Sequence, residues 1–240
     1  MLVSAAVCPS PPLLVPAVAA GAAPELDGAR AACTDALGVL AAARPDRLVV
    51  VGPAEPAAAG DHPQGATGSF RGFGVDVGVV LGGAAPGGTE APARALPPSL
   101  AVAAWLLEHV HWSAAPVSAL GVDERLATGR CVAAGQEIAA RDDRVALLVM
   151  GDASACRTLK APGYLDDRAA GFDAAVAAAL SAADVAALTA LDTELASALK
   201  AAGRAPWQVL AGAAEGARLG GALLYEDAPY GVGYLVAAWS

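Results

Sequence analysis

The chain has 240 residues, of which 56% are hydrophobic, and its 15 Lys and Arg against 24 Asp and Glu give a formal net charge of −9. This length suits one domain with a substantial core. The acidic balance, with no cluster of basic residues, excludes binding to nucleic acid or to an anionic membrane through bulk charge, because both need positive charge opposite phosphate.

The first third of the chain alternates strand-like and helical runs. A short apolar run at 2–7 predicts a central strand, which the following prolines end. Apolar residues at helical spacing predict a helix over 24–43. The continuous apolar run at 48–51 is typical of a strand buried on both faces of a parallel sheet. After a Gly- and Pro-rich loop at 52–71, residues 74–81 predict a third strand.

The rest of the chain continues the alternation after a Gly, Pro and Ala loop expected at 82–98. Ser99 is predicted to cap a helix that ends near His109. The later elements are a strand at 116–120, a helix at 123–141, a strand at 145–150, helices at 166–182, 184–202 and 205–214, and strands at 222–225 and 231–239. The last strand is expected near the interior of the sheet. The pattern predicts one domain over 1–240, a three-layer α/β/α fold with a mainly parallel or mixed central sheet.

The apolar N-terminal stretch is not expected to be a signal peptide, because it lacks a basic start and four prolines interrupt it between positions 9 and 16. No run of about 20 apolar residues predicts a membrane-spanning helix. The four cysteines are widely spaced without a CxxC pair and are expected to be reduced. The sequence therefore predicts a cytoplasmic protein.

Ligands of open α/β sheets bind outside the carboxyl ends of the strands. This rule selects the loops that begin at Cys8, Gly52 and Gly151, and the turn at Glu226. The polar residues there form the predicted ligand-binding set: Ser10, Glu55, His62, Asp152, Ser154, Arg157, Lys160 and Asp227. Arg157 and Lys160 together favour an anionic ligand.

Four segments carry a resemblance to a known family: CPSPPLLVP at 8–16, GSFRGFGVDV at 68–77, MGDASACRTLKAPGYLDDRA at 150–169 and DAPYGVGYLVAAW at 227–239. With the order of the strand-end loops, they resemble actinobacterial B-subunit-like members of the class III extradiol dioxygenase family, over nearly the whole chain. The superfamily also contains the Memo proteins. The resemblance implies that active relatives hold one non-haem Fe(II) with two histidines and a carboxylate, and use a further histidine in acid–base catalysis.

The histidines that the resemblance implies are missing. Ser10 stands where many relatives have the first histidine, and there is none near Glu55 or within 154–157. Only the carboxylate has candidates, Glu226 and Asp227. Two of the three histidines, His109 and His111, would point about 200° apart on a helix and so could not share a metal there. No metal site is therefore predicted.

The leading hypothesis is an extradiol-dioxygenase-like pseudoenzyme or redirected member that has lost the Fe(II) site and binds a small anionic or aromatic ligand without a cofactor. Two alternatives remain open. One is an atypical Fe(II)-dependent ring-cleaving dioxygenase that uses His62 with Glu55 and Glu226 or Asp227. The other is a structural protein that binds a partner. The resemblance also implies a homo-oligomer.

Overall fold

The computed structural model describes residues 1–83, 94–141 and 143–240. Its main sheet has seven strands in the order β3-β6-β2-β7-β1-β9-β8. Their bounds are β1 Leu2–Cys8, β2 Arg47–Ala54, β3 Gly60–His62, β6 Val117–Asp123, β7 Val145–Met150, β8 Gly221–Asp227 and β9 Tyr234–Trp239. The four strands β6, β2, β7 and β1 are parallel, and β3, β9 and β8 pair antiparallel at the two sides. Of the two arrangements left open by the prediction, mainly parallel or mixed, the structure shows the mixed sheet.

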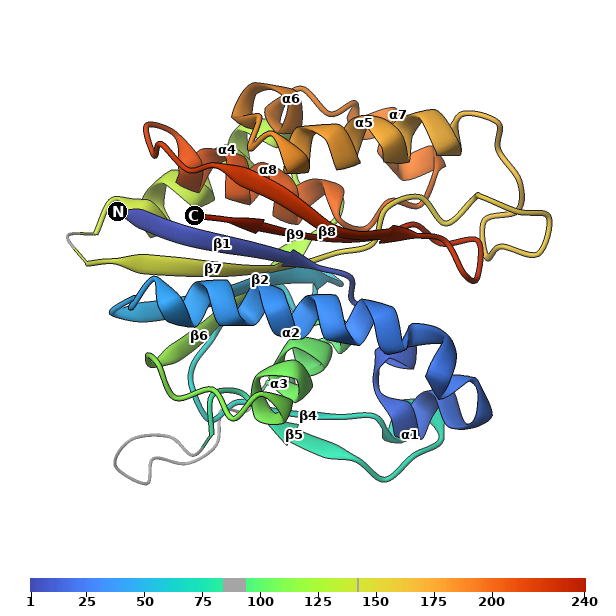
Figure 1. Ribbon diagram of the computed structural model, residues 1–240, viewed down its shortest axis with the longest axis horizontal. Helices are drawn as coiled ribbons and strands as arrows, with labels where there is room; N and C mark the ends of the chain where they lie inside the picture. The colour runs from blue at the N-terminus through green and yellow to red at the C-terminus, as the bar shows by residue number, and fades with distance from the viewer. Residues whose placement is uncertain (84–93, 142) are drawn as a thin grey trace.

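Helices cover both faces of this sheet, which confirms the three-layer α/β/α fold (Figure 1). On one face lie α2 (Asp27–Ala42) and α3 (Pro98–His109). On the other lie α4 (Thr128–Ala139), α5 (Ala169–Ser181), α6 (Val185–Thr189), α7 (Thr193–Ala198) and α8 (Arg204–Ala214). The short α1 (Pro16–Ala19) and 3₁₀ turns at Pro12–Leu14 and Ala20–Leu26 join β1 to α2.

The core consists of two apolar clusters, one on each face of the sheet. Strand β7 contributes to both, because successive side chains of a strand point to opposite faces. Leu148 and Met150 pack on the side of α2 and α3, whereas Leu147 and Val149 pack on the side of α8. Burial on both faces explains why the central strands are continuous apolar runs rather than alternating ones.

Small residues allow α4 and α8 to pack closely on the second face. A Cβ atom added at Gly135 would clash with the backbone carbonyl of Val209, and one at Gly212 would clash with that of Val132. The alanine- and glycine-rich composition therefore reflects backbone-to-backbone packing between these helices.

Two predicted elements differ in the structure. Residues 52–71, expected to be a loop, contain β3 and β4 (Thr67–Ser69). The strand expected at 74–81 shrinks to β5 (Gly78–Val80), which pairs with β4 in a separate two-stranded sheet over α3. Short pairings of this kind depend on tertiary contacts and leave only a weak local signal. Of the loop expected at 82–98, residues 84–93 lie outside the described residues.

Three helix predictions were also wrong. The helix expected at 123–141 begins only at Thr128, because β6 extends to Asp123. Ser99 lies inside α3, where its hydroxyl donates to the Pro53 carbonyl at 2.6 Å, and Pro97 precedes the helix instead. The helix expected at 184–202 is divided into α6 and α7. Asp192 begins the second of these by accepting from the backbone N–H groups of Glu194 and Leu195, as an N-cap does.

No helix in the described part of the chain is long and apolar enough to cross a membrane. The four cysteines are buried and form no disulfide.

Candidate functional site

The carboxyl ends of the four parallel strands all lie on the same side of the molecule, on the right in Figure 1. The chain leaving β2 passes to the face that carries α3, whereas the chain leaving β6 passes to the face that carries α4. Neighbouring strands whose connections diverge in this way leave a crevice between them. The same divergence occurs between β2 and β7 and between β7 and β1, because β7 leads to α5 on the second face whereas β1 leads to α2 on the first. The carboxyl ends of β2 and β6 therefore form one of three expected binding positions.

A groove of about 990 Å³ lies at this position. Its lining comes from residues 54–56 at the end of β2, residues 123–125 at the end of β6, and the segment from α7 to the first residue of α8. Most of these side chains are exposed, so the groove is open to solvent. Its volume is in the range of sites for small molecules.

The groove has charges of both signs. Its acidic residues are Glu55, Asp123, Glu124 and Glu194, and its basic residues are Arg125, Lys200 and Arg204. Within residues 1–83, 94–141 and 143–240, none of these seven side chains takes part in an ion pair. Unpaired charges that converge on one concave surface can bind a ligand that carries the opposite charges.

Arg204 is the most buried of these residues, with 4% of its surface exposed. One terminal nitrogen donates to the Leu126 carbonyl at 2.6 Å and to Gln208 Oε1 at 3.1 Å, and the other donates to the Glu124 carbonyl. These acceptors are uncharged. They hold the guanidinium in place but do not neutralise it, so a buried positive charge remains at the wall of the groove.

The Glu124 carboxyl lies in this mixed field. Partial burial raises its pKa, and the negative charges of Asp123 and Glu55 act in the same direction. Arg125 and Arg204 act in the opposite direction. These charges are therefore close enough to influence one another through the groove.

Asp152 follows β7 and adjoins the segment that lines the groove. Its Oδ1 accepts from the Ser10 N–H at 2.7 Å, and its backbone carbonyl accepts from the Gly203 N–H at 2.9 Å. Burial raises the pKa of this carboxyl to about 7, and the charge of Glu124 adds to the shift. Tyr234, buried at the start of β9, has a pKa raised by burial and then by the Asp152 charge. Asp152 can therefore give or take a proton near neutral pH.

Ser154 and Arg157 instead bind Asp173 of α5. The buried Asp173 carboxylate accepts from the Ser154 N–H at 2.8 Å, the Ser154 hydroxyl at 2.9 Å and the Arg157 guanidinium at 3.0 Å. This network attaches the loop after β7 to α5. Lys160 is exposed further along the same loop.

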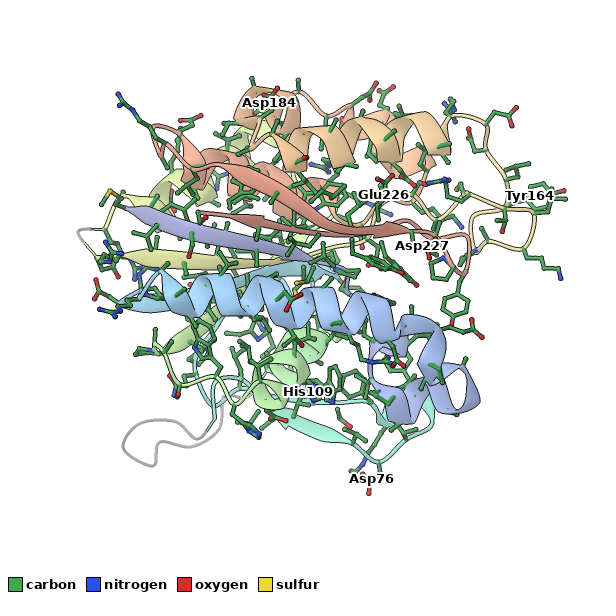
Figure 2. The ribbon with its side chains drawn as sticks, viewed as in Figure 1. Asp76, His109, Tyr164, Asp184, Glu226 and Asp227 are labelled. Atoms are coloured by element: carbon green, nitrogen blue, oxygen red, sulfur yellow. The ribbon has the colours of Figure 1, made fainter. Side chains whose placement is uncertain are left out.

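His62 and Asp227 lie at opposite sides of the sheet. His62 is on the edge strand β3, is 1% exposed, and its Nε2 is 2.9 Å from the Ala58 carbonyl. Asp227 ends β8, the other edge strand, beside Glu226 (Figure 2). Six strand spacings separate the two edges, roughly 29 Å.

The alternative Fe(II) ligand set is therefore not assembled. The described residues contain no group of three His, Cys, Asp or Glu side chains placed to hold a metal ion. His109 stacks on Trp105 near the end of α3, with ring centroids 5.2 Å apart. The side chains present do not fit a two-histidine, one-carboxylate iron centre.

Of the eight predicted residues, only Glu55 lines the groove, while Ser10 and Asp152 adjoin it through their hydrogen bonds. Sequence reasoning missed Glu124 and Arg125 because it ended the strand at residue 120. Pairing with β2 carries β6 to Asp123, and the correct strand end would have selected both residues. Arg204 had no such signal, since it lies at the start of a helix rather than after a strand.

No family model and no curated protein matches the chain. Among solved structures, the chain is similar to the crystal structure of the uncharacterised protein JW3007 from Escherichia coli K12. The TM-score is 0.51 at 16% sequence identity, over 99% of each chain. At this identity the similarity shows a shared fold, from end to end of both chains, and nothing more.

Proposed function

We propose that this protein binds a small organic ligand in the groove at the carboxyl ends of β2 and β6. The observation that carries the proposal is the groove itself, about 990 Å³ at the crevice of the sheet and lined by charged side chains without ion-pair partners among the described residues. Arg125, Lys200 and Arg204 favour a ligand with an acidic group.

The proposal includes membership of the extradiol-dioxygenase-like group without its iron chemistry. Two placements support the loss of iron chemistry. Ser10, in the loop after β1, donates its backbone N–H to Asp152. His62 lies on the edge strand β3, and its Nε2 is 2.9 Å from the carbonyl of Ala58, which precedes that strand. Cysteines that are buried and unbridged support a cytoplasmic setting.

Calorimetric titration with aromatic and aliphatic carboxylates tests the binding. We expect at least one to bind, and Arg125→Gln to weaken that binding about tenfold, since a charge-assisted contact is worth roughly 1.5 kcal/mol. Arg130→Gln is the matched control, because Arg130 is an exposed arginine of α4 outside the groove lining. If no compound binds, or if both variants behave alike, the groove is not the site.

Metal analysis of protein produced in medium with iron and zinc tests the proposed loss of the iron site. We expect no stoichiometric metal. Tightly held iron that disappears on His62→Ala, together with cleavage of catechol, would replace this proposal by the atypical dioxygenase.

A further inference from the structure

The basic side of the groove is built around the start of α8. Arg204 is the first residue of this 11-residue helix, and its buried guanidinium has only uncharged acceptors among the described residues. Two N–H groups of this guanidinium have no acceptor among the described residues. One is at Nε, and the other is at the terminal nitrogen that donates to the Glu124 carbonyl. Lys200 and Arg125 add two exposed cations on the same lining. The partial positive charge of a helix N-terminus acts in the same direction.

The acidic side comes from other elements. Glu55 follows β2, Glu124 follows β6, and Glu194 lies in the first turn of α7. The carboxylates therefore reach the groove from three different loops or helices, and no described cation pairs with them.

A ligand with a single type of charge fits this lining poorly. An anion near Arg204 would also approach Glu55 and Glu124, and a cation near the carboxylates would approach Arg204. A molecule with both charges at separate ends satisfies each side, because every charge then meets an opposite one.

We propose that the groove binds a zwitterion of the amino-acid type, with its carboxylate toward Arg204, Lys200 and Arg125 and its ammonium group toward Glu55 and Glu124. This inference rests on the proposed function, since it names the class of ligand for the same groove. The volume of about 990 Å³ leaves room for a side chain or a second residue, so a short peptide belongs to the same class.

Calorimetry with three matched sets of compounds tests the pairing of charges: unbranched ω-amino carboxylates from three to eight carbons, the carboxylates of the same length, and the amines of the same length. We expect at least one ω-amino carboxylate to bind ten times more tightly than both its carboxylate and its amine.

Two variants test which side of the groove binds the ammonium group of the ligand and which side binds its carboxylate. Glu55→Gln should weaken binding of the best zwitterion about tenfold and leave binding of the simple carboxylate unchanged or stronger. Lys200→Gln should weaken both compounds. Glu137→Gln, on the exposed side of α4 and outside the lining, is the control for a general loss of negative charge.

The outcomes separate this inference from the function it rests on. Simple carboxylates that bind as tightly as the zwitterions, with Glu55→Gln without effect, refute the zwitterion and leave small-ligand binding standing. Absence of binding by all three sets and by the aromatic acids refutes both. Arg204 is left unchanged in this design because its removal would uncover buried carbonyls and disturb the fold.

Discussion

Protonation of the Asp152 carboxyl is expected to make the stability of this protein depend on pH. In the folded protein burial holds the pKa of this carboxyl at about 7, against 3.8 for an ordinary aspartate. Folding therefore favours the protonated form. The stability that this preference contributes is complete below about pH 4 and is lost as the pH rises through about 7, because the unfolded chain then releases the proton and the folded one holds it.

The size follows from the shift. About three pKa units correspond to roughly 4 kcal/mol, and partial exposure of Asp152 to solvent reduces the expectation to about 2–3 kcal/mol. Asp152→Asn keeps an acceptor for the Ser10 N–H and removes the titration. Its stability relative to the natural protein should therefore rise by about 2–3 kcal/mol between pH 4 and pH 7.5.

Urea unfolding at half-unit pH steps measures this difference, since other titrating groups cancel between the two proteins. Asp61→Asn, at an exposed aspartate of β3, is the control for the loss of one carboxylate. A constant offset between the Asp152→Asn and natural profiles across this range would show that the carboxyl titrates normally and that the account of its burial is mistaken.

Three further predictions concern stability and are measured by thermal and urea unfolding. Gly135→Ala should lower the free energy of unfolding by about 3 kcal/mol or more, because the added methyl group meets the α8 backbone. Gly38→Ala, in open space on α2, should raise it by about 0.5–1 kcal/mol. Equal effects of the two substitutions would contradict the close packing of α4 on α8. Asp173→Ala should lower the free energy of unfolding by about 2–4 kcal/mol, because three donors lose their acceptor. A loss under about 1 kcal/mol would mean that this network is not formed. Trp239→Phe should cost about 1–3 kcal/mol, since the indole N–H donates to the buried Leu180 carbonyl at 2.7 Å, and an unchanged midpoint would exclude that bond.

Local patterns were enough to predict the central strands. The apolar run 145–150 coincides with β7, and the runs at 2–7 and 48–51 fall within β1 and β2. A strand buried on both faces needs apolar residues at every position, so its sequence is unmistakable. The edge strand β3 was missed because it has only three residues and pairs with β6 alone, so it does not need an apolar residue at every position.

The candidate site was less predictable. Glu55 and Asp152 could be selected because both follow strands, and ligands collect at strand ends. His62 was selected by residue type alone, and its position on an edge strand removes it from the groove. Ser154 and Arg157 are occupied by Asp173, which lies 16 residues or more further along the chain and could not be linked to them from spacing.

Composition and periodicity determined the α/β/α layers and the shortage of histidines for an iron centre, because each depends on residue type or on spacing along one element. The tertiary structure decided which charges meet. Arg204 reaches the groove only because α8 packs against α4 and brings its first residue beside Leu126 and Glu124. Contacts between segments about 80 residues apart depend on how the whole chain packs, and no local pattern encodes them.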